Sequence, residues 1–60
     1  MAEFYRSEIS IILNKISALN SDLFKANSKR DRHFILEELE VAYCELSDAI
    51  GDYRHELAEV

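Results

Sequence analysis

The stretch ILEELEVAYCELSDAIGDYRHEL, residues 35–57, decides the fold of this 60-residue chain. Its apolar and aromatic residues recur at alternating spacings of three and four, which places them along one stripe of a helix. A β-strand would need an alternation of period two, which this stretch lacks. When the same spacing is followed in both directions, it predicts a helix over residues 29–59.

A second stripe with the same spacing runs from Tyr5 to Ala26 and predicts a helix over residues 2–26. Residues 27–28 form the predicted turn. Asn27 can adopt the left-handed conformation that ends a helix, and Ser28 with Asp31 resembles a capping box. Because so short a turn makes consecutive helices antiparallel neighbours, we expect an all-α fold: a single helical-hairpin domain over residues 1–60.

The two stripes together form the predicted assembly seam, in which every position is apolar or aromatic. These positions are Tyr5, Ile9, Ile12, Ile16, Leu19, Leu23, Leu36, Leu39, Tyr43, Leu46, Ile50 and Tyr53. In the second helix the small residues Ala42 and Ala49 lie beside the seam and widen it. A widened stripe suits a bundle of more than two helices, so we expect two hairpins to pair into a four-helix bundle with coiled-coil packing.

The size of the chain also favours association. Below about 70–80 residues, a single core rarely supplies more than about 3–5 kcal/mol of stability. The chain has one cysteine and therefore cannot form an internal disulfide bond. We expect the missing cover to come from a second copy, which would make a homodimer, or from a helical partner protein.

Acidic residues dominate the charge of the chain. There are 12 Asp and Glu residues against 7 Lys and Arg residues, and the net charge is -5. Such a charge repels the phosphates of nucleic acids and of anionic membranes, so we expect no membrane association and disfavour nucleic acid as a partner. With no signal-peptide pattern and no long apolar run, a cytoplasmic location is expected.

The charges are segregated along the sequence. Four bases at the predicted turn are candidates for contact with an anion: Lys25, Lys29, Arg30 and Arg32. Lys25 complements the dipole at the end of the first helix, whereas Lys29 and Arg30 oppose the dipole at the start of the second. From residue 37 onward there are eight acids and one base. This acidic run is interpreted as a solvated face, or else as a docking face for a basic partner or a mimic of nucleic acid.

Some apolar residues lie off the seam and suggest a further partner surface. Phe4 and Ile11 share an outward position seven residues apart. Either they join one wide core because a straight helix drifts relative to the heptad, or they contact a partner. The second helix is predicted to be longer and to project past the first, which leaves Leu57 and Val60 in need of cover.

Few residues invite a catalytic or metal-binding interpretation. Asp52, His55 and Glu59 share one helical face, but that face points away from the seam and the first helix has no matching histidine. Cys44 has acidic surroundings, which do not favour a reactive thiolate, and no role is assigned to His33. No phosphate-binding loop or zinc motif is present. We therefore expect no catalytic residue, no metal and no cofactor.

The function expected from these observations is that of a non-enzymatic helical interaction protein. An adaptor, regulator, inhibitor or co-chaperone that acts by helix packing fits the seam and the small size. The alternatives are a nucleic-acid-binding regulator that uses the four bases at the turn, or an acidic mimic of nucleic acid that inhibits a DNA-binding protein.

Overall fold

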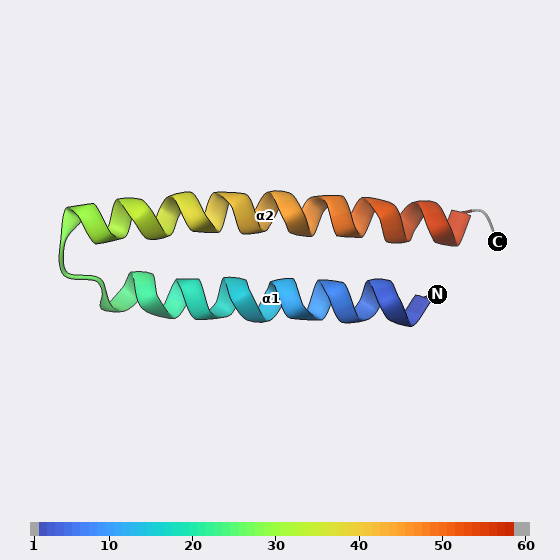
Figure 1. Ribbon diagram of the computed structural model, residues 1–60, viewed down its shortest axis with the longest axis horizontal. Coiled ribbons are helices and arrows are strands. Elements are labelled where there is room, and N and C mark those ends of the chain that lie inside the picture. Colours follow the sequence, from blue (N-terminus) through green and yellow to red (C-terminus); the bar gives the residue numbers. More distant parts are fainter. Residues whose placement is uncertain (1, 59–60) are drawn as a thin grey trace.

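Two helices make up the part of the chain that the computed structural model describes, residues 2–58. Helix α1 spans Ala2–Lys25 and helix α2 spans Lys29–Ala58. They lie side by side and antiparallel, and the turn between them closes one end (Figure 1). The described chain is therefore an all-α helical hairpin, as the heptad spacing predicted. Helix α1 ends one residue earlier than expected, and the predicted end of the second helix at residue 59 lies outside the described residues.

The turn confirms one half of the predicted cap and corrects the other. The backbone N–H of Asp31 donates to the Ser28 hydroxyl oxygen at 3.0 Å, so Ser28 caps the start of α2. The left-handed conformation expected at Asn27 is wrong, because no non-glycine residue in 2–58 has a positive φ angle. Instead, α1 ends in a tight turn in which the Ala26 N–H donates to the Leu23 carbonyl at 3.3 Å.

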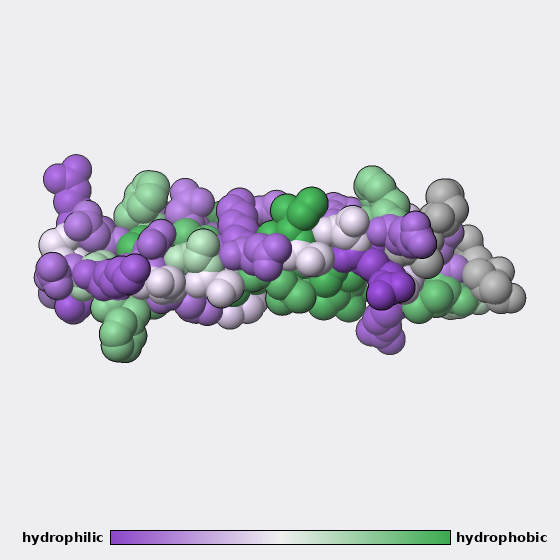
Figure 2. Space-filling model, turned by 90° about the horizontal axis from the view of Figure 1, so that it is seen from below, coloured by the Kyte–Doolittle hydropathy of each residue, from purple (hydrophilic) through white to green (hydrophobic). Residues whose placement is uncertain are grey.

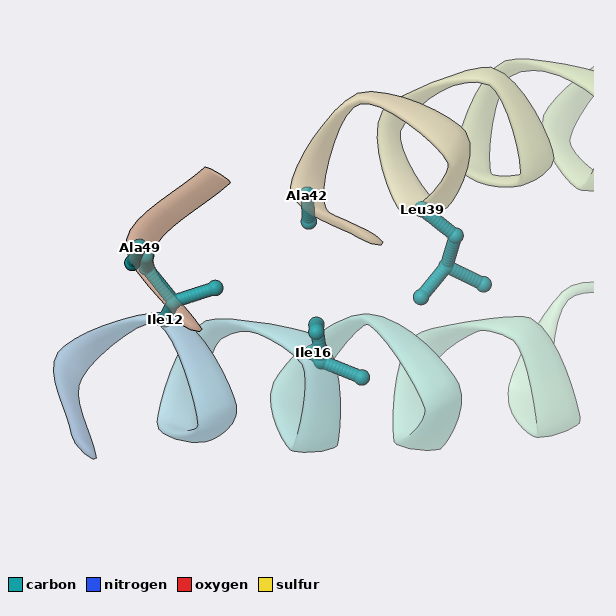
Figure 3. Close-up of a cluster of buried hydrophobic side chains, with 5 residues drawn as sticks. All are labelled: Ile12, Ile16, Leu39, Ala42 and Ala49. Carbon is teal, nitrogen blue, oxygen red and sulfur yellow. The ribbon is translucent and has the colours of Figure 1, made fainter. Parts of the chain in front are cut away.

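The core is a single layer between the helices. Its buried members are Ile12, Ile16, Leu39, Ala42 and Ala49. The two isoleucines of α1 point toward α2, where the two alanines and Leu39 face them (Figure 3). Ala42 is 0% exposed. Because alanine carries only one methyl group, the larger isoleucine side chains of α1 can pack close to the backbone of α2.

The predicted seam is intact in α1 but divided in α2. Every seam residue of α1 is buried or half-buried. In α2 the seam residues Leu39, Leu46 and Tyr53 are buried or half-buried, whereas the alternate ones, Leu36, Tyr43 and Ile50, are exposed. The contact of α2 is thus rotated toward Ala42 and Ala49. The small alanines fit against α1 more closely than a column of bulky residues would, which turns the bulky column outward.

The hairpin exposes more surface than a compact protein of its mass. Its accessible surface is 4969 Å² at 7.0 kDa, whereas a compact monomer of this mass exposes about 4,000 Å². The principal extents are 48 × 15 × 10 Å, and the radius of gyration is 14.2 Å against about 10 Å for a globular chain of this length. One layer of two helices therefore leaves roughly 900 Å² of surface that a thicker fold would cover.

Helix α2 extends past α1 at both ends (Figure 1), so the predicted overhang is shared between the turn end and the opposite end. Leu57 is exposed near the second of these ends, as expected. Val60 lies outside the described residues.

We expect Ile16→Ala to lower the free energy of unfolding by about 2–5 kcal/mol, because it empties part of the layer of side chains packed between α1 and α2. The matched control is Ile11→Ala on the same helix, since Ile16 is 6% exposed and Ile11 is 68% exposed. The control should change stability by less than about 0.5 kcal/mol. Thermal unfolding followed by helical circular dichroism measures both, and equal effects would contradict the core assignment.

Candidate interaction surface

A column of exposed apolar residues follows one flank of α2. Leu36, Tyr43, Ile50 and Leu57 are seven residues apart and 42–55% exposed. A spacing of seven keeps them in line along the helix, over a length of about 31 Å. They lie directly beside the contact with α1, because Leu39, Leu46 and Tyr53 on the neighbouring seam position take part in it. The column therefore continues the core outward on one side of the hairpin.

The opposite flank of α2 is acidic. Glu45 is two residues from Tyr43 and thus about 200° around the helix, on the other side of the contact with α1. It shares its heptad position with Asp31, Glu38 and Asp52. The acidic column is the surface that the nucleic-acid-mimic interpretation would use. Helix α2 thus separates an apolar flank from an acidic one.

An ion pair shows which side of α1 lies beside this acidic flank. The Lys15 ammonium lies 3.6 Å from the Glu45 carboxylate, and both side chains are about half exposed. Such an exposed pair contributes at most about 1 kcal/mol to the stability of the fold. It is informative chiefly because it shows which residues of α1 and α2 lie opposite each other. Leu13 is two residues from Lys15 and lies on the opposite side of α1, beside the apolar column of α2.

Measured along the helix axis, Leu13 also lies close to the midpoint between Tyr43 and Ile50. This follows from the antiparallel register, which Tyr5 stacked on Tyr53 and Lys15 paired with Glu45 define. We name the surface formed by Leu13, Leu36, Tyr43, Ile50 and Leu57 the Leu36 face. Figure 2, which views the hairpin from the α1 side, shows hydrophobic atoms along the lower edge of the middle of the molecule and a further group at its upper edge.

The predicted partner residues do not come together. Phe4 and Ile11 are 66% and 68% exposed, so they do not join the core of the hairpin. Ile11 is four residues from Lys15 and shares the side of α1 that faces the acidic flank. Leu57 belongs to the Leu36 face on the other side. Phe34 and Val41 are also exposed and lie seven residues apart on α2; they were not among the predicted partner residues, although the same heptad count identifies them.

The three seam tyrosines differ in their surroundings. The rings of Tyr5 and Tyr53 stack across the helices with centroids 5.9 Å apart and an angle of 11° between their planes. Phe4 meets Tyr5 edge to face at 5.5 Å. Tyr43 instead stands exposed on the Leu36 face. Two of the tyrosines therefore close the end of the core, and the third is presented outward.

The four basic residues at the turn have different roles. The Arg32 side-chain Nε–H donates to the Ala26 carbonyl oxygen at 3.2 Å, which ties the end of α1 to the start of α2. Lys25, Lys29 and Arg30 are exposed. Of the four bases, Arg32 is thus engaged in the turn, whereas these three are exposed at the surface.

The described residues that invited a catalytic or metal-binding interpretation are all exposed: His33, Cys44, Asp52 and His55. His33 Nε2 lies 3.4 Å from the Glu37 carboxylate on the surface, and Cys44 is exposed. Among residues 2–58, no three His, Cys, Asp or Glu side chains are grouped so that they could hold a metal ion. Glu59, which the sequence analysis placed beside Asp52 and His55, lies outside the described residues. A shallow hollow on α1 is lined by Glu3, Arg6, Ser7 and Ser10.

Gly51 lies on the outer surface of α2. A Cβ atom at this position would meet nothing within 4 Å, so no other segment of the described hairpin approaches its backbone. Gly51 is therefore a tolerated surface glycine of α2.

Within residues 2–58, neither helix is long and apolar enough to cross a membrane. Comparison with protein-family models, with curated proteins and with solved structures finds no match. The Leu36 face is the feature of the described hairpin that bears most directly on function.

We expect Arg32→Ala to lower the free energy of unfolding by about 0.5–1.5 kcal/mol, because it removes a side-chain hydrogen bond to the end of α1. Arg30→Ala is the matched control two residues away, and it should cost less than about 0.5 kcal/mol. Chemical denaturation of both variants tests this. An Arg30→Ala effect as large as that of Arg32→Ala would contradict a specific role of Arg32 in the turn.

Proposed function

We propose that the protein is a small non-enzymatic interaction protein that acts by helix packing through the Leu36 face. The observation that carries this proposal is the column of four exposed apolar residues at heptad spacing beside the core, joined by Leu13 from α1. Heptad spacing is the pattern by which one helix packs against another. An adaptor, regulator, inhibitor or co-chaperone uses a surface of this kind.

The energetics of the exposed surface support the proposal. Covering large apolar side chains stabilises a complex by about 25 cal/mol per Å² removed from water. Monomeric proteins rarely leave extended apolar patches uncovered. Among residues 2–58 the core holds three large buried side chains and two alanines, with five half-buried apolar side chains packed against them, so the intramolecular packing that stabilises the hairpin is limited. Association through the Leu36 face would therefore stabilise the fold as well as form the complex.

The acidic flank supports the choice of face. Burying acids without partners is costly, so a partner helix is disfavoured along the column of Asp31, Glu38, Glu45 and Asp52. These acids keep their side of the hairpin in water. The Leu36 face, by contrast, can be covered without burying a charge at its centre.

We expect sedimentation at micromolar concentration, with the helical signal recorded in parallel, to show that folding depends on association. The chain should be a helical oligomer, or else a poorly helical monomer whose missing cover belongs to another protein. Tyr43→Glu should weaken the oligomer or its helicity, because it places a charge in the Leu36 face. Val41→Glu, at an equally exposed position outside the face, is the control.

A fully helical monomer would contradict this function, provided that its melting temperature did not change with concentration and that Tyr43→Glu left it unaffected. Under those conditions the hairpin would need no cover.

A second candidate function rests on the exposed cations at the turn. Lys29 and Arg30 stand at the N-terminus of α2, where their charge opposes the helix dipole and does not serve the helix. Contact with an anion such as a nucleic acid phosphate would give these charges a role. The net charge of -5 opposes such binding, so the interaction would be confined to this end of the hairpin.

If the turn binds nucleic acid, affinity for a duplex should fall steeply with salt, and a Lys29→Ala/Arg30→Ala variant should weaken binding and flatten that dependence. Arg6→Ala, near the other end of the hairpin, is the control and should change little. Fluorescence anisotropy with a labelled duplex at low salt measures the affinity. An absence of binding by the wild-type chain would eliminate this candidate.

A further inference from the structure

We infer that the Leu36 face is covered by a second copy of this chain, with the two α2 helices antiparallel across a twofold axis at Ser47. The inference rests on the proposed function and names the partner. Four observations carry it: the symmetry of the apolar column, the arrangement of two opposite charges, the level of Leu13, and the surface that the hairpin leaves exposed.

The apolar column is complementary to itself when one copy is reversed. Its midpoint lies between Tyr43 and Ile50. Reversal about this point sets Leu36 against Leu57 of the second copy, and Tyr43 against Ile50. A twofold interface uses the same patch on both subunits, so each of these contacts occurs twice. Every large side chain of the column then meets another large apolar side chain.

Two charges of opposite sign flank the column and select the antiparallel orientation. Glu40 and Arg54 are each seven residues from Ser47, on the same outer edge of the face. In the antiparallel arrangement Glu40 of each copy meets Arg54 of the other, so two ion pairs form. If the two α2 helices packed in parallel about a twofold axis, the outer edges of the two copies would lie on opposite sides of the interface, and Glu40 would not meet Arg54 of the other copy. Charges at the rim of an interface set orientation in this way more than they set affinity.

The position of Leu13 on α1 is consistent with the same twofold axis. It lies close to the level of the midpoint of the column, so the twofold axis that relates the α2 helices also brings Leu13 near Leu13 of the second copy. The alternative dimer, in which α2 packs on α1 of the second copy, is less favourable. Its α1 side carries the exposed Leu13 and Phe24, but it would also set the apolar column against Arg6 and Asn20, which share the heptad position of Leu13.

The hairpin as a whole exposes enough extra surface for a dimer contact of ordinary size, and the Leu36 face is one part of that surface. The hairpin exposes roughly 900 Å² more than a compact chain of its mass. A standard protein–protein interface buries about 800 Å² on each partner. Ser47 at the axis is small, which allows the two α2 helices to approach closely. The acidic columns of the two copies face away from this interface, so their repulsion is screened by water.

A cysteine at the axis tests the arrangement directly. In a Cys44→Ser background, Ser47→Cys should form a disulfide bond between copies on mild oxidation, because facing residues at the axis meet the Cα separation that a disulfide needs. Asp48→Cys in the same background is the control, since residue 48 lies on the other side of α2. A non-reducing gel should show a covalent dimer only for Ser47→Cys. Equal crosslinking at both positions, or no crosslinking at residue 47 in a sedimenting dimer, would overturn the inference.

Exchange of the flanking charges gives an independent test. Glu40→Arg and Arg54→Glu should each weaken the dimer about tenfold at low salt, because each converts two attractive contacts into two repulsive ones. The double variant should return to within about threefold of the wild type, since it restores both pairs with the signs reversed. Sedimentation equilibrium measures the dissociation constants. If the double variant were as weak as the single variants, the antiparallel pairing would be wrong.

These outcomes separate the inference from the function on which it rests. A poorly helical monomer at micromolar concentration would overturn the second copy as partner and leave the interaction function standing. A fully helical monomer with a concentration-independent melting temperature would overturn both. A dimer without crosslinking at residue 47 would overturn only the antiparallel arrangement.

Discussion

The packing of two isoleucines of α1 against two alanines of α2 is the contact on which the rest of the hairpin depends. Ala42 and Ala49 are almost completely buried beside Ile12 and Ile16. Because the alanines are small, the contact is centred on their side of α2, and the bulky column of Leu36, Tyr43 and Ile50 is turned outward. The exposed Leu36 face is thus a consequence of where the small residues lie.

The two flanks of the hairpin have opposite chemical character for the same reason. Once the contact passes through the alanine side of α2, the column of Asp31, Glu38, Glu45 and Asp52 lies on one side and the apolar column on the other. An acidic flank keeps water on its side and disfavours aggregation of hairpins there. The apolar flank is therefore the side on which we propose association, although exposed apolar residues also lie at other positions.

The short turn limits how α1 and α2 can be arranged relative to each other. Ser28 caps α2, and Arg32 donates to the carbonyl group of Ala26, the first residue after α1, so the turn is tied by side-chain hydrogen bonds and not by a left-handed residue. With the turn fixed, the helices must run alongside each other for most of their length. A core one layer thick follows, and with it the surface that a second layer of helices would cover.

The sequence by itself determined the two helices, the position of the turn and the seam of α1, because heptad spacing and the Ser28 cap act locally. It also identified Ala42 and Ala49 as small residues beside the seam. Only the tertiary structure decided which part of the α2 stripe α1 covers, since a stripe of three adjacent columns can be covered from either side. That choice depends on side-chain volume across the contact, and it separated Leu57 from Phe4 and Ile11 and brought Leu13 beside the exposed column.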